Sequence, residues 1–161
     1  MGSNLLADAR ALETTLSNWR RHLHAHPELS GHEANTATYV AAALREMGLE
    51  PRERVGGMYG LTVDLGPAEG ARVALRADMD ALPIQEQTGL LYASRTPGVM
   101  HACGHDAHTA MLLGAARLLS ARRGALRRPV RLIFQPAEEQ PPGGAQPMID
   151  AGVLDGVERA Y

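Results

Sequence analysis

Metal-binding side chains are concentrated in one short segment, residues 101–108, whose sequence is His-Ala-Cys-Gly-His-Asp-Ala-His. It holds the only cysteine of the chain and three of its seven histidines. Thiolate and imidazole bind zinc-like divalent metals well, and residues two apart in an extended segment point the same way. Cys103 and His105 could therefore reach one ion, and the start of a following helix would lower the thiol pKa. The alternative, a buried cysteine beside surface histidines, is disfavoured by the local density of ligand types.

A second candidate is the acidic pair Glu138-Glu139, which follows an apolar run typical of a strand. Adjacent side chains there tend to point apart, so one carboxylate could bind a metal while the other faces a reacting water. A bound ion lowers the pKa of water from 15.7 toward roughly 7, and a base that takes the proton contributes about 10²–10⁴-fold. On its own the pair could be a solvated acidic loop, but beside the cysteine segment it suggests metal-assisted hydrolysis.

Two further groups leave their role open. Asp78 and Asp80 follow a predicted strand and share one face, so they could bind a metal, orient a ligand or face water. His22 and His26 have the i,i+4 spacing of helical zinc ligands, but no Glu follows His22 as in the metalloprotease pattern. We therefore favour a structural or substrate-pocket role for these histidines.

Length, charge and cysteine usage narrow the class of protein. A chain of 161 residues is one domain or a piece of a larger one. A net charge of −2 gives no reason to expect nucleic acid or an acidic membrane surface as a partner, and no apolar run is long enough to span a membrane. One cysteine, no internal disulfide and no secretion-signal pattern predict a cytoplasmic protein.

Hydrophobic periodicity predicts helices alternating with strands. Apolar spacing indicates helices over about 4–25, over the segment that contains Ala37 and Leu44, and from an Asp106 N-cap onward, with a short one near 144–151. Alternating residues predict strands at 61–65 and 73–77, joined as a hairpin by the turn 66–70, and residues 130–134 predict a strand buried on both faces. The long irregular segment 81–104 indicates a functional loop, and the whole pattern predicts a layered α/β domain.

Taken together, the motifs resemble those of the amidohydrolase branch of the aminoacylase/carboxypeptidase metallopeptidase superfamily, which includes hippurate hydrolases, N-acyl-amino-acid amidohydrolases and auxin-conjugate hydrolases. The matching segments occur in family order and cover nearly the whole chain, so that jointly they are highly specific. They are residues 20–30, 76–84, 100–110, 135–139, 143–145 and 149–154.

The resemblance implies a role for each candidate residue. Cys103 and His105 match ligands of a two-metal centre, and Glu139 matches a further ligand. Glu138 matches the catalytic base that activates the water, and Asp80 matches an acidic residue with a supporting role beside the site.

Three neighbours receive no ligand role from the resemblance. Asp78 stands where other branches of the superfamily have a metal-binding histidine, so we do not expect it to be a ligand. His101 and His108 flank the predicted ligand pair and are expected to be neighbours of the site.

The implied reaction is hydrolysis of the amide bond of an N-acyl-amino acid, or a similar peptide-like small molecule, by metal-activated water. The implied cofactors are two divalent ions, from among manganese, zinc, cobalt and nickel. The implied fold is a three-layer α/β metallopeptidase-like catalytic domain, with a mixed sheet flanked by helices.

Members of the superfamily are longer than this chain. They carry an inserted lid domain, which often mediates dimerisation, and two more metal-binding histidines, the nearer of which would follow Tyr161. We therefore expect residues 1–161 to be the N-terminal part of a zinc-peptidase-like catalytic domain, incomplete without the lid and the C-terminal part, and weakly active or inactive in isolation. The alternatives are a truncated non-catalytic fragment, a metallo-carboxypeptidase or dipeptidase, and a hydrolase with Cys103 as nucleophile, which would leave the acidic pair without a role.

Overall fold

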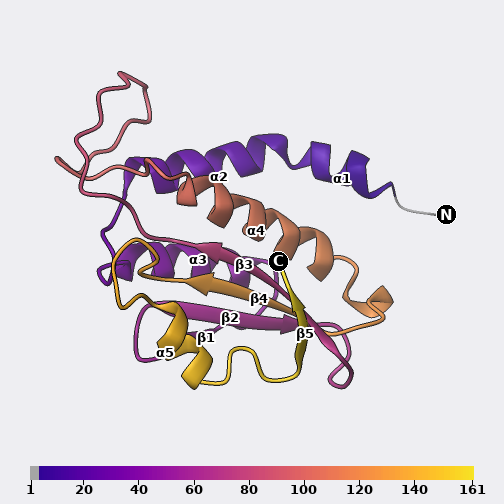
Figure 1. The fold of residues 1–161 in the computed structure, drawn as a ribbon. Helices are drawn as coiled ribbons and strands as arrows, with labels where there is room; N and C mark the ends of the chain where they lie inside the picture. The colour runs from indigo at the N-terminus through magenta and orange to yellow at the C-terminus, as the bar shows by residue number, and fades with distance from the viewer. Residues whose placement is uncertain (1–3) are drawn as a thin grey trace.

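The computed structural model describes residues 4–161 as a single mixed sheet between helices (Figure 1). The sheet has five strands in the order β1-β2-β4-β3-β5, with α1 to α4 on one face and α5 on the other. The predicted α/β class with a mixed, helix-flanked sheet is confirmed. In chain order the elements are α1 (Leu5–Ala11), α2 (Glu13–Ala25), α3 (Ala34–Glu46), β1 (Arg52–Val55), β2 (Gly60–Leu65), β3 (Arg72–Asp78), α4 (His105–Ser120), the 3₁₀ turn η1 (Arg123–Ala125), β4 (Val130–Gln135), α5 (Ala145–Asp150) and β5 (Val157–Ala160).

Strand β4 lies at the centre of the sheet, and this makes the predicted hairpin wrong. β2 pairs antiparallel with β4, and β3 pairs parallel with β4 on its other side. Leu65 at the end of β2 and Val73 in β3 both face Val130, so the turn 66–70 passes around the start of β4. The predicted burial of β4 explains why it lies between β2 and β3, because Leu132 to Gln135 are all buried and need a neighbour on each side.

The N-terminal helix is in two pieces where a single helix over about 4–25 was expected. Leu12 separates α1 from α2, with its backbone N–H donating to the carbonyl of Ala9. None of the residues of α1 is buried, whereas α2 buries Leu23, His24 and Ala25 at its C-terminal end. Only the end of α2 is therefore anchored near the segment that carries the cysteine.

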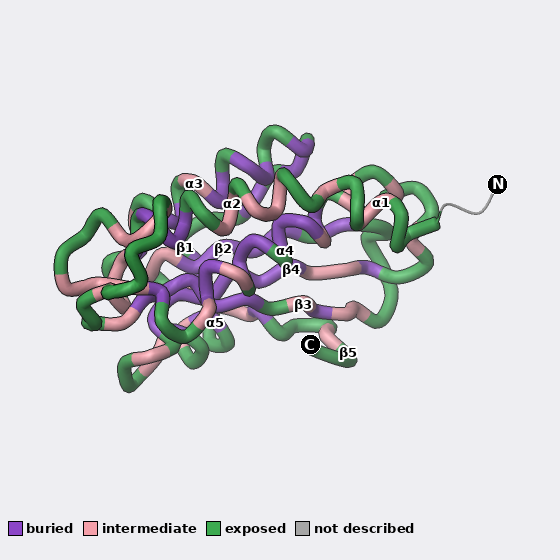
Figure 2. Tube along the Cα trace, turned by 90° about the horizontal axis from the view of Figure 1, so that it is seen from above, coloured by how far each residue is buried: buried purple, intermediate pink, exposed green. Residues whose placement is uncertain are grey.

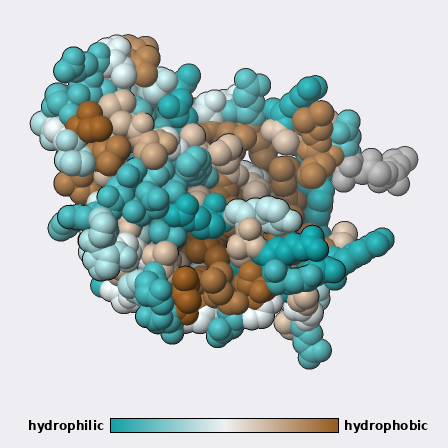
Figure 3. Space-filling model, viewed as in Figure 1, coloured by the Kyte–Doolittle hydropathy of each residue, from teal (hydrophilic) through white to brown (hydrophobic). Residues whose placement is uncertain are grey.

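The main core lies between the sheet and helices α3 and α4. Leu44 from α3, Leu113 from α4 and Phe134 from β4 are completely buried there, and Figure 2 shows α4 and the central strands as the most buried part of the molecule. A smaller cluster around Ile133 and Met148 packs α5 on the opposite face. Apolar surface remains between α5 and β5 (Figure 3). Within residues 4–161, no helix is long and apolar enough to cross a membrane.

The segment between β3 and α4 forms an irregular loop, as expected for residues 81–104. It is pinned near its ends, because Leu29 bridges to Ala81 and Leu82 bridges to Met100. β3 and β4 are parallel, so the residues after both strands meet at one edge of the sheet, beside the start of α4. In open α/β sheets this edge, at the carboxyl ends of the strands, is where ligands bind.

Candidate metal centre

The structure brings the three predicted metal ligands together at this edge. Donor atoms of Cys103, His105 and Glu139 all lie within 4.8 Å of one another. Cys103 ends the loop, His105 is the first residue of α4, and Glu139 follows β4. Cys103 is exposed, Glu139 half-buried and His105 buried, so the cluster is reachable from solvent on the cysteine side.

Helix α4 begins at His105, and its N-cap is Gly104, two residues before the expected N-cap. Gly104 has a φ of 92° in the left-handed region, which glycine adopts without strain. The expected N-cap, Asp106, lies inside the first turn and is buried. As a result, the consecutive residues His105 and Asp106 extend into two different polar clusters.

Asp80 fixes the orientation of the His105 ring. His105 Nδ1 lies 2.9 Å from the Asp80 carbonyl oxygen and 3.2 Å from its Oδ1. Both partners are acceptors, so Nδ1 carries a proton and Nε2 is the nitrogen that faces the cluster. A histidine whose other nitrogen donates to a carbonyl or carboxylate is the usual arrangement of a metal ligand.

Asp80 itself is held by donors from three segments. Its Oδ2 accepts from Ser30 Oγ at 2.6 Å and from the Glu139 backbone N–H at 2.9 Å. Burial would raise the pKa of Asp80, but the hydrogen bonds from His105, Ser30 and the backbone of Glu139 and Glu138 hold it well below its usual value. A carboxylate engaged in this way is suited to position His105 and Glu139 rather than to exchange protons.

One oxygen of Glu139 has no donor. Glu139 Oε1 is shielded from solvent and makes no hydrogen bond to residues 4–161, and it lies 3.6 Å from His105 Nε2. An unpartnered buried carboxylate oxygen is costly unless a cation or donor satisfies it. The sulfur, nitrogen and oxygen donors that converge here suit zinc and neighbouring divalent transition metals, so the residues present fit a metal.

The expectation of a lowered thiol pKa is wrong for the metal-free chain. The pKa of Cys103 is raised to about 11, first by a hydrogen bond with the Glu139 side chain, then by burial and by the charges of Glu139, Glu138 and Asp78. Carboxylates from different segments outweigh the positive end of α4, and their convergence is visible only in the folded chain.

The two carboxylates of the acidic pair differ in exposure. Glu139 is half-buried in the cluster and Glu138 is exposed. The preceding residue, Ala137, has a φ of 50°, a left-handed conformation that is strained for a residue with a Cβ. Its N–H donates to Glu33 Oε1 at 2.7 Å and its carbonyl accepts from the Gly144 N–H at 2.8 Å. This strained turn redirects the chain just before the pair.

Glu33 is a site-supporting residue that the sequence did not reveal. It is completely buried, and its Oε1 also accepts from the Gly31 N–H at 2.9 Å. Burial raises the pKa of this carboxyl although the hydrogen bonds from the backbone oppose the shift. Nothing in its local sequence marked it, because its partner Ala137 is more than a hundred residues away along the chain.

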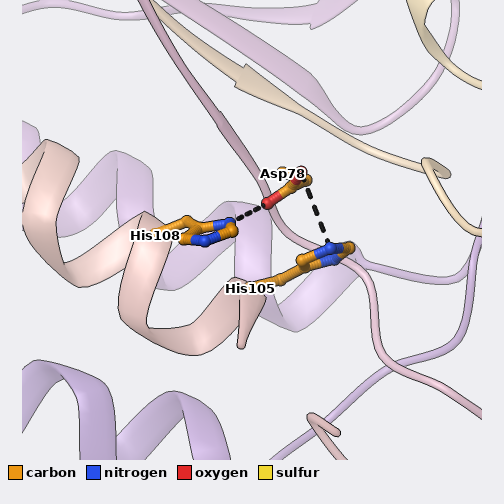
Figure 4. A group of neighbouring side chains, drawn as sticks. All are labelled: Asp78, His105 and His108. Carbon is orange, nitrogen blue, oxygen red and sulfur yellow. Dashed lines mark hydrogen bonds and ion pairs between the residues drawn. The ribbon is translucent and has the colours of Figure 1, made fainter. Parts of the chain in front are cut away.

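A second donor group shares His105. Figure 4 shows His105 and His108 from α4 facing Asp78 at the end of β3. Asp78 Oδ1 lies 2.7 Å from His108 Nδ1, and Oδ2 lies 3.6 Å from His105 Nε2 and accepts from Arg76 at 2.8 Å. Both oxygens of Asp78 are therefore already engaged, unlike Oε1 of Glu139. No ligand role was expected for Asp78 or His108, and both lie in contact with the predicted ligand His105.

An ion cluster occupies the other side of the first turn of α4. Asp106 Oδ2 accepts from Arg20 Nε at 3.0 Å and from His24 Nδ1 at 2.8 Å, and His24 Nε2 lies 3.2 Å from Glu86 Oε1. Glu86 also accepts from the Ser94 N–H and from Thr88. Burial would raise the pKa of Glu86, but its hydrogen bonds from Ser94, Thr88 and His24 lower it. The cluster ties α2 and α4 to the loop.

His101 is buried beside this cluster. Its side chain is 5 % exposed, and neither ring nitrogen makes a hydrogen bond to residues 4–161. Burial lowers its pKa to about 4. The structure does not place it in either donor group that includes His105.

The fold and the donor cluster define an α/β protein with a candidate metal centre at the edge of its sheet. The chain belongs to the peptidase family M20/M25/M40, whose family model matches residues 74–161. This is a family of hydrolases, as the motif series implied.

Three relatives illustrate the similarity. An N-acyl-L-amino acid amidohydrolase of Geobacillus stearothermophilus is 51 % identical over 147 residues, which are 91 % of this chain and 40 % of the relative. A Rhodococcus jostii (strain RHA1) protein named glutamate–cysteine ligase 2-3 is 56 % identical over 92 % of this chain, but only 18 % of its own length is matched. A crystal structure of a dinuclear metal-binding M20 peptidase from Bacillus subtilis has a TM-score of 0.87 and 47 % identity, over 94 % of this chain and 42 % of its own. The chain thus spans less than half of the length of each of these proteins.

Proposed function

We propose that this chain carries part of the catalytic centre of a metal-dependent amidohydrolase that cleaves the amide bond of N-acyl-amino acids. The observation that carries the proposal is the convergence of Cys103, His105 and Glu139 around a buried carboxylate oxygen without a donor. The similarity to an N-acyl-L-amino acid amidohydrolase supports the substrate class. The unmatched length of the relatives supports an assignment of residues 1–161 to the N-terminal part of the catalytic domain, with the lid and the C-terminal part outside it.

In this proposal Cys103, His105 Nε2 and Glu139 hold divalent metal, and the dinuclear relative supports two ions drawn from manganese, zinc, cobalt or nickel. When bound, the metal polarises the substrate carbonyl and lowers the pKa of water. Asp80 keeps the His105 lone pair directed into the cluster and, through the Glu139 N–H, holds the chain that carries Glu139.

Glu138 is the proposed general base. It is exposed next to the half-buried Glu139, and both follow the strained turn at Ala137. Its carboxylate takes a proton from the attacking water and passes it to the leaving amine, so that it is regenerated after each turnover. We place this chemistry in the reducing cytoplasm, where the single thiol stays free for metal.

The test is hydrolysis of N-acetyl-amino acids by the product of the whole gene, with each candidate metal added after removal of bound ions. We expect Glu138→Gln to lower kcat by about 10²–10⁴-fold, because the general base is lost, while metal content stays the same. The matched control Glu69→Gln changes an exposed carboxylate on the turn between β2 and β3 and should leave kcat unaltered. A protein that hydrolyses none of these substrates with any metal would overturn the proposal.

Two alternatives have distinct outcomes in the same assays. A non-catalytic role for residues 1–161 alone is favoured by the share of its relatives that the chain covers, and predicts weak metal binding without turnover by this chain. A thiol hydrolase that used Cys103 as nucleophile would keep its activity after chelation, whereas the proposed metalloenzyme would lose it.

A further inference from the structure

A cavity of about 620 Å³ shares no lining residue with the candidate metal centre. It is lined by the end of α2, the segment between α2 and α3, the start of α3, and Thr96 and Val99 of the loop. Its floor is apolar, with Leu23 and Val99 among the lining residues, and its rim carries the imidazoles of His22, His26 and His32. The i,i+4 histidine pair that the proposed function leaves unexplained therefore borders this cavity.

The His26 ring is fixed with one nitrogen free. Its Nδ1 lies 2.8 Å from the carbonyl oxygen of His22, which can only accept, so Nδ1 carries the proton and Nε2 has the lone pair. This is the same arrangement that prepares His105, and it is the usual orientation of metal-binding histidines. His26 is exposed, so its free nitrogen is accessible to an incoming ion.

The His22 ring is held beside it by stacking. His22 lies 3.9 Å from the Tyr39 ring at 13°, and 4.5 Å from the His26 ring at 33°. Neither nitrogen of His22 makes a hydrogen bond to residues 4–161, and burial, His26 and Arg95 lower its pKa, which favours the neutral ring. Two rings this close can share an ion whose bonds to nitrogen are about 2.0–2.1 Å long.

We propose that His22 and His26 form a second, separate binding site for a borderline divalent cation such as Zn²⁺, Ni²⁺ or Cu²⁺ at the rim of this cavity. Two imidazoles fill two coordination positions, and the remaining positions face the cavity and stay open to water or a small ligand. Imidazole donors select this class of ion over Mg²⁺ or Ca²⁺. The site shares no residue with the candidate centre, so it stands or falls independently of the proposed function.

The test uses Ni²⁺ as the probe and follows the histidine ring signals of the whole chain by NMR. Paramagnetic Ni²⁺ should broaden the signals of His22 and His26 together, with an affinity that His22→Gln or His26→Gln lowers at least about tenfold, since even loss of an outer-shell partner costs about 10–100-fold. The matched control His32→Gln removes an exposed imidazole from the same cavity and should leave the affinity of the pair unaltered.

The readout is residue-specific: Ni²⁺ held by Cys103, His105 and Glu139 should broaden the His105 signals most, whereas the proposed site should broaden those of His22 and His26 most. Ring signals of His22 and His26 that stay sharp at a large excess of Ni²⁺ would overturn the proposal. So would a loss of affinity in His32→Gln as large as that in His22→Gln, because the pair would then not be the site.

Discussion

Two polar clusters meet at the first turn of α4, and they differ in how their charges are balanced. His105 enters the candidate metal centre, and the next residue, Asp106, enters the ion cluster of Arg20, His24 and Glu86. In the ion cluster, each nitrogen of His24 lies within hydrogen-bond distance of a carboxylate oxygen, so the ring links two buried acids. Arg20 also donates to Asp106 Oδ2, so basic and acidic groups face one another, although Asp106 Oδ1 makes no hydrogen bond to residues 4–161.

The metal centre has no such balance. A thiol, an imidazole lone pair and a carboxylate approach one point, and Glu139 Oε1 finds no donor among residues 4–161. The contrast supports a structural role for the ion cluster and the proposed metal-binding role for the donor cluster. Removing a member should therefore cost folding stability in the first case and ligand affinity in the second.

The largest effect is expected from disrupting the ion cluster of Arg20, His24, Glu86 and Asp106. His24→Ala should lower the free energy of unfolding by about 3–5 kcal/mol, because it leaves the buried Glu86 and Asp106 carboxylates without their shared partner. Urea unfolding followed by circular dichroism measures the change. His32→Ala, which removes an exposed histidine, is the control. If the two variants lose the same stability, the ion cluster does not have the structural role assigned to it.

A smaller effect of a different kind is expected in the unbalanced cluster. Glu139→Gln should lower Zn²⁺ or Co²⁺ affinity at least about tenfold, or about 1.4 kcal/mol, because it replaces a charged ligand by an amide. Its backbone bond to Asp80 is kept, so the unfolding free energy of the metal-free chain should not fall. Calorimetric titration compares it with Glu138→Gln, whose exposed side chain should not matter for affinity. Equal metal affinities in the two variants would remove Glu139 from the centre.

The sequence predicted the donor residues because their signals are local. Cys103 and His105 are two residues apart, and the acidic pair directly follows an apolar strand, so residue type and spacing marked them as candidates. Only the resemblance to the superfamily implied Glu139 as a ligand and Glu138 as the base. The structure brings these residues together, and their roles as ligands and base remain predictions. The irregular loop and the short helix near 144–151 were also readable, because Gly, Pro and helical periodicity act within a few residues.

The features that could not be predicted from the sequence depend on contacts between distant segments. The position of β4 between β2 and β3 follows from burial of both its faces, which a turn signal at 66–70 cannot report. The raised thiol pKa arises from carboxylates on two distant segments. The break at Leu12 and the edge strands β1 and β5 carry weak local patterns. Glu33 is the clearest case, since a single acid in a loop has no periodicity to read.

Glu33 gives the smallest effect in this comparison, because one of its carboxylate oxygens is hydrogen-bonded and the other is not. Oε1 accepts from Gly31 and Ala137, and Oε2 is buried without a hydrogen bond to residues 4–161. Its raised pKa means that folding disfavours the ionised form. Below the unfolded-state pKa the carboxyl is protonated in both the folded and the unfolded chain. As the pH rises from there to the folded-state pKa, the carboxyl ionises in the unfolded chain, and this lowers the free energy of unfolding.

Glu33→Gln cannot ionise and still offers an oxygen to the Gly31 and Ala137 N–H groups, so the change in unfolding free energy should stay below about 1.5 kcal/mol, the scale of one hydrogen bond. The free energy of unfolding of the variant, taken relative to that of the wild type, should be higher at pH 7 than at pH 4. The difference should develop above the unfolded-state pKa. Urea unfolding at both pH values measures this, with the exposed Glu69→Gln as control. The opposite result, a variant whose unfolding free energy falls relative to the wild type as the pH rises, would mean that the folded chain stabilises the Glu33 carboxylate. Glu33 Oε2 would then have a partner in solution.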